Sequence, residues 1–280
     1  MKLVLATGVA LASAIALAGN ASAQSDPSWT GFSVGVLGGA VQNGEDEDET
    51  VLFDRNLDGT FGETVVTTAG ANAFAPGFCA GKARGSASSS DCTPDRTGVE
   101  ASLRAGYDYQ WGAFVIGAVA EISTSSVRDS VTAFSATPAS YTFQRNLNSL
   151  AAARLRLGYA VGPALVFASG GYAQGKIDNR FRTSNGVNSF STTSEDEQDA
   201  DGFQAGAGVE YRLAPNLSVI GEYMYTSLDL DDPFAVRVGR GGAPATNPFI
   251  LPPNTTGTDM ARSNDSFETH AFRIGMAYRF

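Results

Sequence analysis

The last stretch of the chain, residues 270–280, constrains its fold more than any other segment. Apolar side chains occupy every second position, and small or charged residues stand between them; the apolar ones are Phe272, Ile274, Met276, Tyr278 and Phe280. Successive side chains of a β-strand point to opposite faces, so a strict period of two indicates a strand with one apolar face and one polar face. The polar face carries Arg273 and Arg279.

The same alternation recurs along the chain. Including the final strand from about 267, the strands are expected at about 30–40, 99–111, 113–123, 147–160, 164–177, 202–212 and 217–227. Each is close to the 9–11 residues that cross a membrane when a strand is tilted. The pattern is weakest in the segment 164–177, where Gly170 and Gly171 interrupt it. The sequence therefore predicts an all-β protein, an eight-stranded antiparallel transmembrane β-barrel.

The connections between these strands alternate in length. Tight turns are expected at 111–113, 161–163 and 214–216, where Gly, Pro and Asn supply the dihedral angles that turns need. The other connections are long: 41–98, 124–146, 178–201 and 228–266. Short turns on one side and long loops on the other are typical of outer-membrane barrels, with the turns in the periplasm and the loops outside the cell.

Charge indicates which face of the barrel meets lipid. Every charged residue on a predicted strand lies on its polar face. A Lys or Arg on the lipid face near the midplane would cost about 2–4 kcal/mol, so the apolar face is expected to point outward. Aromatic residues on that face gather near the short turns and predict a belt at the periplasmic interface: Tyr109, Trp111, Phe114, Tyr159, Tyr211, Tyr278 and Phe280.

The polar faces bring charges to similar heights inside the predicted barrel. These residues are Arg104, Glu121, Arg154, Arg156, Glu210, Glu222 and Arg273, with Arg156 and Glu210 slightly lower. Neighbouring strands favour the pairs Glu121–Arg154 and Glu222–Arg273. An eight-stranded barrel is just wide enough for side chains to fill it, which favours a structural ion-pair network. The alternative is a narrow, gated pore lined by the same residues.

The first long loop, 41–98, is acidic and contains a candidate calcium turn. Asp54, Asn56 and Asp58 alternate before a glycine, as in the opening of an EF-hand loop. An EF-hand loop has at its twelfth position a glutamate that binds calcium through both carboxylate oxygens. Here that position holds Val65, and Glu63 lies two residues before it. Calcium binding and a solvated acidic turn are therefore both retained, and no other cofactor is expected.

The N-terminus predicts export. Lys2 precedes an apolar run over 3–18, and Ala21-Ser22-Ala23 provides a small-residue cleavage site. This pattern indicates a cleaved signal peptide at 1–23 and a mature barrel domain over 24–280. In an exported chain the two cysteines, Cys79 and Cys92, favour one disulfide within the first loop.

Composition and motifs argue against several other functions. The formal net charge of −10 disfavours a nucleic-acid partner, because phosphate binding needs a basic surface. His270 is the only histidine, and it lies on the lipid-facing parity of the last strand. Some outer-membrane lipid A deacylases have a serine two residues after such a histidine, but Phe272 occupies that position here. A non-enzymatic protein is expected.

Several motifs carry a resemblance to a known family: Arg104-Ala-Gly-Tyr107, Arg156-Leu-Gly-Tyr159, Glu222-Tyr-Met-Tyr225 and the final Arg273-Ile-Gly-Met-Ala-Tyr-Arg-Phe280. With these the chain resembles the small outer-membrane β-barrels that include opacity-type proteins and the OmpA transmembrane domain, in alphaproteobacterial versions. The resemblance implies a bacterial outer-membrane location. It also implies that the final strand is an assembly signal for the barrel-assembly machinery.

The same resemblance sets the functional expectation. It implies a barrel that supports envelope integrity and presents its loops for surface interactions, with a narrow porin-like channel for small solutes as the alternative. Outer-membrane lipid and lipopolysaccharide are the expected partners, and the sequence identifies no particular surface ligand.

Overall fold

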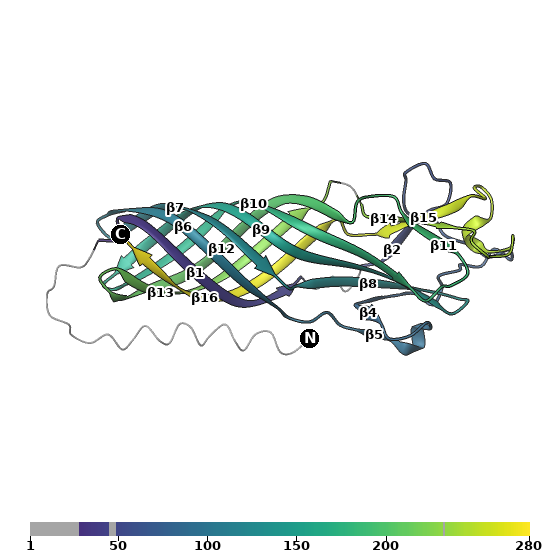
Figure 1. The fold of residues 1–280 in the computed structure, drawn as a ribbon, viewed down its shortest axis with the longest axis horizontal. Coiled ribbons are helices and arrows are strands. Elements are labelled where there is room, and N and C mark those ends of the chain that lie inside the picture. Colours follow the sequence, from purple (N-terminus) through teal and green to yellow (C-terminus); the bar gives the residue numbers. More distant parts are fainter. Residues whose placement is uncertain (1–27, 45–48, 232) are drawn as a thin grey trace.

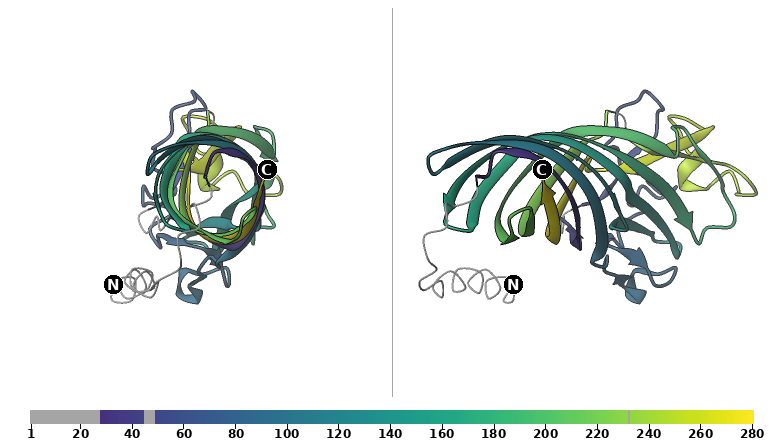
Figure 2. Two further views of the ribbon diagram at one scale, coloured as in Figure 1. Left: turned by 90° about the vertical axis from the view of Figure 1, so that its left-hand side faces the viewer. Right: turned by 60° about the vertical axis from the view of Figure 1, so that its left-hand side comes forward.

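Eight antiparallel strands close into a barrel in the computed structural model, which describes residues 28–44, 49–231 and 233–280 (Figure 1). They are β1 (Gly31–Asn43), β6 (Gly98–Trp111), β7 (Phe114–Ser125), β9 (Ala139–Val161), β10 (Ala164–Thr183), β12 (Glu197–Ala214), β13 (Leu217–Asp229) and β16 (Ser266–Arg279). β1 pairs with β16, which closes the ring seen end-on in Figure 2. The predicted signal peptide and the acidic residues 45–48 lie outside the described residues.

Burial alternates along most of each strand as the sequence predicts, with apolar side chains outside and charged ones inside. Lys176 is an exception to the prediction that every charged strand residue lies on the polar face: it is exposed on the outer face of β10, near the extracellular end of the predicted strand. All the predicted belt aromatics are exposed, from 44% for Tyr211 to 79% for Trp111. Near the extracellular side a second set of exposed aromatics includes Tyr172, Phe203 and Tyr223. Among the described residues, no helix has the length and apolar character needed to cross a bilayer.

The short turns occur where the sequence places them. Gly112 and Gly162 have φ angles of 61° and 54°, in the left-handed region that a residue with a Cβ seldom adopts. Each lets its strand reverse within two residues, so β6 pairs directly with β7 and β9 with β10. These turns lie at the periplasmic end of the barrel, on the left in Figure 1.

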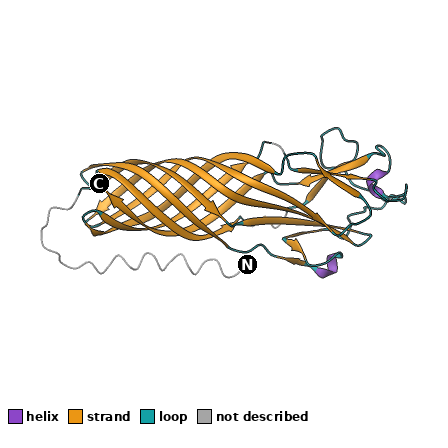
Figure 3. Cartoon of the chain, in the orientation of Figure 1, coloured by secondary structure: helices purple, strands orange, loops and turns teal. Residues whose placement is uncertain are grey.

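The long connections contain more regular structure than the sequence suggests. β9 begins at Ala139 rather than at about 147, and β8 (Arg128–Ser135) pairs with this extension. β3 (Phe78–Ala80) pairs with β8, and β4 (Lys82–Ala83) pairs with β5 (Cys92–Thr93). The only helical turns among the described residues are two 3₁₀ turns, η2 (Ser88–Ser90) and η3 (Pro248–Ile250), shown in Figure 3.

A second sheet forms beyond the membrane from segments of three different connections. Its order is β11 (Ser189–Thr192), β14 (Ala235–Gly239), β15 (Gly257–Arg262) and β2 (Val51–Asp54). We call the part of the chain at 49–97, 127–146, 178–200 and 233–265 the extracellular module. It lies at the right of Figure 1, at the end opposite the short turns.

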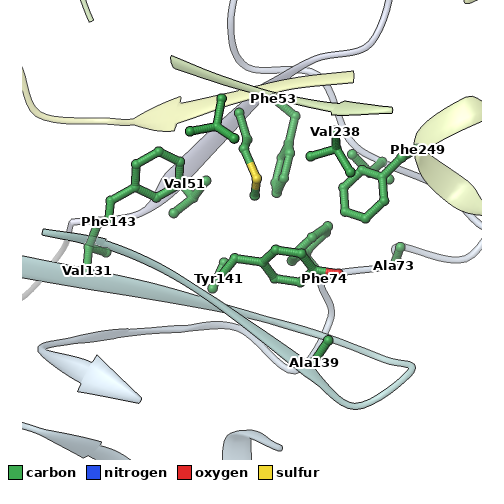
Figure 4. Close-up of a cluster of buried hydrophobic side chains, with 14 of the residues drawn as sticks. Val51, Phe53, Ala73, Phe74, Val131, Ala139, Tyr141, Phe143, Val238 and Phe249 are labelled. Carbon is green, nitrogen blue, oxygen red and sulfur yellow. The ribbon is translucent and has the colours of Figure 1, made fainter. Parts of the chain in front are cut away.

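The extracellular module has its own hydrophobic core (Figure 4). Phe53 from β2 and Phe74 from the first connection pack with their ring planes tilted and their centroids 4.4 Å apart, and Phe74 also contacts Tyr141 of β9 at 5.4 Å. Phe249 from η3 packs against both Phe74 and Tyr141. Because this core draws on the first, second and fourth connections together, the loops fold as one packed unit.

Candidate functional site

The barrel interior holds a balanced layer of buried ions, which we call the upper charged layer: Arg104, Arg154, Arg273, Glu100, Glu121 and Glu222. Arg273 is its centre. Its guanidinium contacts Glu222 at 2.5 Å, Glu121 at 2.6 Å and Glu100 at 2.7 Å. With three cations and three anions, the layer satisfies its own charge away from water, as a buried ion network requires.

Contacts between adjacent strands and across the barrel complete the upper charged layer. Arg154 pairs with Glu121 at 2.9 Å and also donates to Gln204, and Arg104 pairs with Glu222 at 3.1 Å. Both pairs that the sequence favours, Glu121–Arg154 and Glu222–Arg273, occur. Gln204 in turn donates to Thr226, so neutral groups on β12 and β13 extend the network.

A separate layer lies nearer the periplasm, and we call it the lower charged layer: Asp108, Arg156, Glu210 and Arg279. Arg156 contacts Glu210 at 2.6 Å and Asp108 at 3.2 Å. The sequence places Arg156 and Glu210 slightly lower than the other residues of one network, and the structure shows that they have ion-pair partners of their own. The structure also adds Asp108 and Arg279 to this layer. Strand parity predicted that both side chains face inward, but no sequence pattern predicted their ion-pair partners.

Buried apolar side chains separate and cover the charged layers. Leu37, Phe167 and Ile220 lie between them, and Phe167 stacks on the guanidinium of Arg156 at 3.9 Å. Above the upper charged layer lies a larger group, the apolar plug: Val41, Leu147, Leu150, Ile177, Met224, Leu228 and Phe267, together with neighbouring alanines and Leu230. Buried apolar side chains from several strands therefore meet inside the barrel both between the charged layers and above them.

A third ion cluster, the mouth cluster, joins the extracellular module to the barrel. Arg262 of β15 contacts Asp129 of β8 at 2.6 Å and pairs with Glu49, and Asp129 also binds Arg145 of β9 at 2.6 Å. Arg145 in turn lies over the ring of Phe267 in the apolar plug, at 5.5 Å. Sequence reasoning missed this cluster because Glu49 and Arg262 are separated by 213 residues and belong to different connections.

The carboxylates of the mouth cluster and its surroundings respond differently to burial. Burial raises the pKa of Glu49, and the nearby Arg262 only partly opposes it. Burial also raises the pKa of Asp95, which accepts hydrogen bonds from Ser130. For Asp129 burial acts in the same direction, but Arg262 and Arg145 outweigh it and hold its pKa below the ordinary value.

These directions predict a stability maximum for the extracellular module at mildly acidic pH. Because their pKa values are raised in the folded state, Glu49 and Asp95 stabilise the fold more as pH falls, until pH reaches the ordinary pKa of 4.5 for Glu49 and 3.8 for Asp95. The lowered pKa of Asp129 means that its contribution is lost as pH falls below about 3.8. Hydrogen exchange of β2, β14 and β15 measured from pH 3 to pH 8 should show the maximum. Glu49→Gln should flatten the limb above pH 4.5, and unchanged curvature in that variant would contradict the assignment to Glu49.

The predicted calcium residues lie in one tight turn, where backbone amides donate hydrogen bonds to their carboxylate oxygens. Asp54 accepts hydrogen bonds from the amides of Leu57 and Gly59, and Asp58 accepts one from Thr60. Asn56 donates to Asp58 at 2.9 Å, and Glu63 accepts from the amides of residues 55 and 56. No group of three or more His, Cys, Asp or Glu side chains in the described ranges is arranged to hold a metal. Calcium binding at this turn stays a prediction.

Cys79 and Cys92 form a disulfide in the extracellular module. It links β3 to β5 and so ties the strand beside β8 to the small hairpin of β4 and β5. Between β3 and β4, the carbonyl of Gly81 accepts a hydrogen bond from the hydroxyl of Thr132 on β8. The disulfide therefore holds the far part of the first connection against the second.

The single histidine lies on the outer surface of the barrel. Its Nδ1 is 2.6 Å from the hydroxyl of Tyr223, and its ring lies beside those of Tyr223 and Tyr225. Phe272 completes this aromatic row next to Tyr223. The row faces lipid at the extracellular interface, a position where aromatic side chains are favoured.

The residues of the predicted assembly signal share one outward face of β16. Phe272, Ile274, Met276, Tyr278 and Phe280 are between 45% and 70% exposed. Tyr278 and Phe280 contact each other edge to face, at 5.1 Å between ring centroids. Their recognition by the barrel-assembly machinery stays a prediction.

Comparisons with known proteins agree with this architecture. Residues 9–280 match the model of the outer membrane protein beta-barrel domain family. The 31 kDa outer-membrane immunogenic proteins of Brucella melitensis and Brucella suis are each 30% identical to the chain over 158 residues, 51% of this chain and 65% of theirs. The chain thus spans just under two thirds of the length of these relatives.

Solved outer-membrane proteins are similar to the chain at much lower identity. OprG from Pseudomonas aeruginosa aligns with a TM-score of 0.49 and 14% identity, over 90% of this chain and 96% of that one. Ail of Yersinia pestis aligns with a TM-score of 0.35 and 11% identity, over 90% and 99% of the two chains.

Proposed function

Because this chain belongs to the outer membrane protein β-barrel family of the bacterial outer membrane, we propose that it is a non-enzymatic, non-conducting barrel that supports the envelope and presents a folded surface for interactions. The observation that carries the proposal is the stacking of charged and apolar layers through the barrel interior. A lumen filled with paired ions and packed side chains has a structural role that needs no solute.

The extracellular module supports the second part of the proposal. Its core is built from aromatic and aliphatic side chains of several connections, so it presents a defined surface rather than independent loops. A preorganised surface loses less conformational entropy on binding than loops that must first be ordered. Loops positioned by a rigid scaffold are also where binding functions concentrate.

A narrow channel is the second candidate, and one observation favours it. Within the described interior, Ser102 Oγ, Asp108 Oδ1, Arg154 Nε and Arg156 Nε are buried and bond to no protein group. Buried polar atoms of this kind usually bind water, so both charged layers are expected to be partly hydrated. The apolar plug would have to move for these waters to connect with the outside.

Conductance in planar bilayers separates the two candidates. We expect the refolded wild-type barrel, shown to be folded by its heat-modifiable mobility, to give no steady openings. Glu121→Ala should remain equally silent, since the apolar plug lies above the altered layer. Steady wild-type openings whose size changes in Glu121→Ala would instead establish a pore through the upper charged layer. Glu63→Ala, outside the barrel, is the matched control.

A further inference from the structure

The chain segment just before β1, residues 28–30, crosses the periplasmic mouth of the barrel. We call it the N-terminal segment. Its middle residue, Trp29, is only 1% exposed, although it lies outside the strands. The Trp29 side chain packs with Val115 of β7 and Leu165 of β10, both buried and inward-facing, and with Ala160 of β9. In the ring of strands β10 lies opposite β1, so one indole spans the mouth from wall to wall.

Two arginines of the wall lie over the ring of Trp29. The guanidinium carbon of Arg212 on β12 is 4.2 Å from the ring centroid, and that of Arg279 on β16 is 5.5 Å away. Both distances lie within the range of cation–π attraction, which is stronger where water is excluded. Arg279 also contacts Asp108 of the lower charged layer, so Trp29 covers that layer on its periplasmic side.

Hydrogen bonds from the wall hold the backbone of the N-terminal segment. Arg279 donates to the carbonyl of Trp29 at 2.7 Å, and Arg212 donates to the carbonyl of Ser28 at 2.8 Å. The side-chain oxygen of Gln110 on β6 accepts a hydrogen bond from the amide of Trp29 at 2.7 Å. Side chains of three different strands therefore position the segment, and none of these bonds belongs to the pairing between strands.

The side chain of Arg212 depends on the N-terminal segment for its partners. It is only 8% exposed, and no ion pair involves it within the described ranges, where Glu210 pairs with Arg156 instead. Its hydrogen bond goes to Ser28 and its ring contact to Trp29. A buried cation without an acid is costly, so a carbonyl and an aromatic face are what stabilise it there.

We propose that the N-terminal segment is a stopper that closes the periplasmic end of the lumen and that withdraws while the barrel stays folded. The strand pairing of β1 begins at Gly31, opposite Asp108, so withdrawal breaks no pairing between strands. When the segment leaves, Arg212 and Gln110 regain water in place of their lost bonds, and Arg279 keeps Asp108. No charge is then left buried without a partner, which makes the open state accessible.

The stopper deepens the proposed function and rests on it, because it assumes a lumen that is otherwise closed. The apolar plug blocks the extracellular end and the stopper blocks the periplasmic end. Withdrawal of the stopper lets periplasmic water reach the lower charged layer without creating a continuous pore. Trp29→Ala should therefore remain silent in planar bilayers.

Thiol labelling of the refolded barrel in detergent micelles tests the stopper. Val115→Cys places a thiol behind Trp29, and it is the only free one because Cys79 and Cys92 form a disulfide. We expect a water-soluble methanethiosulfonate reagent to label it slowly, and rapidly once Trp29→Ala is added. Arg212→Gln should speed labelling by about tenfold, the shift in open population expected from losing one charge-assisted hydrogen bond.

Matched variants separate withdrawal of the stopper from general loosening. Ser102→Cys, buried further from the periplasmic end on β6, should stay protected in Arg212→Gln and Trp29→Ala. Arg96→Gln, at an exposed position of the extracellular module, should leave labelling of Val115→Cys unchanged. Heat-modifiable mobility shows that each variant is folded. Equal labelling of Val115→Cys with and without Trp29 would overturn the proposal. So would equal acceleration at Ser102→Cys, or none in Arg212→Gln.

Fluorescence observes the stopper directly. Trp111→Phe leaves Trp29 as the only tryptophan, and acrylamide should quench it weakly in this variant and more strongly when Arg212→Gln is added. Strong quenching with Arg212 intact would overturn the proposal. Conductance of the same preparations reports on the proposed function separately. Steady wild-type openings would contradict a closed lumen, whereas the labelling of Val115→Cys decides whether Trp29 seals the periplasmic end.

Discussion

Replacing Arg273 by methionine is expected to destabilise the barrel by about 3–5 kcal/mol, the cost of breaking a buried ion network by removing one partner. Arg273 contacts Glu100, Glu121 and Glu222, so its loss leaves three carboxylates facing two arginines. Methionine fills much of the same volume but supplies no charge. Urea-induced unfolding of the barrel in lipid vesicles, followed by tryptophan fluorescence, measures the change.

Two further variants show whether charge is the cause. Adding Glu100→Gln to Arg273→Met removes the one excess carboxylate, whose ion pair among the described residues is with Arg273, and should recover part of the lost stability, because a neutral network is far less costly than an unpaired buried charge. Arg96→Met, at an exposed position, should change the free energy of unfolding by less than about 0.5 kcal/mol. A loss in Arg273→Met no larger than in this control would show that the network does not stabilise the barrel.

Arg262→Met is expected to release the extracellular module while leaving the barrel folded. Among the described residues Glu49 forms its ion pair with Arg262, whereas Asp129, when Arg262 is removed, still pairs with Arg145. Leaving Glu49 buried and unpaired should lower the local stability of the module by about 3–5 kcal/mol. Hydrogen exchange should then accelerate in β2, β14 and β15, and protection in β6, β7 and β13 should stay unchanged.

The matched control for this variant lies in the same sheet. Arg237 of β14 pairs with Asp259 at 2.6 Å, but its side chain is 41% exposed. Arg237→Met should therefore cost no more than about 1 kcal/mol, as exposed ion pairs usually do. If both variants left exchange unaltered, the mouth cluster would not be what joins the module to the barrel.

The fold of the barrel could be predicted because its rules are local. Each strand must place apolar side chains toward lipid and polar ones inward, so a period of two, as in 99–111, identifies both the strand and its faces. Positive-φ glycines at Gly112 and Gly162 then specify the short turns. Parity and counting along the strands were enough to predict the pairs Glu121–Arg154 and Glu222–Arg273, because each joins adjacent strands. Glu222 lies directly opposite Arg273, and Glu121 lies diagonally from Arg154.

The rest depended on contacts across the barrel and between connections. Arg273 reaches Glu121, which lies on a strand that is not its neighbour, and only a closed ring of the observed register brings them together. Counting along the strands places Arg156 and Glu210 slightly lower, but only the structure shows that they form a separate layer with Asp108 and Arg279. Strand parity places those two residues inside without giving their partners.

The sequence by itself determined which residues face lipid, which face inward and where the chain turns, since hydrophobic alternation and turn chemistry act over a few residues. Only the tertiary structure decided that the loops form a packed module and that Glu49 meets Arg262. Those features arise when segments far apart in the chain share one core or one surface. Their energies depend on burial and distance, which no local pattern encodes.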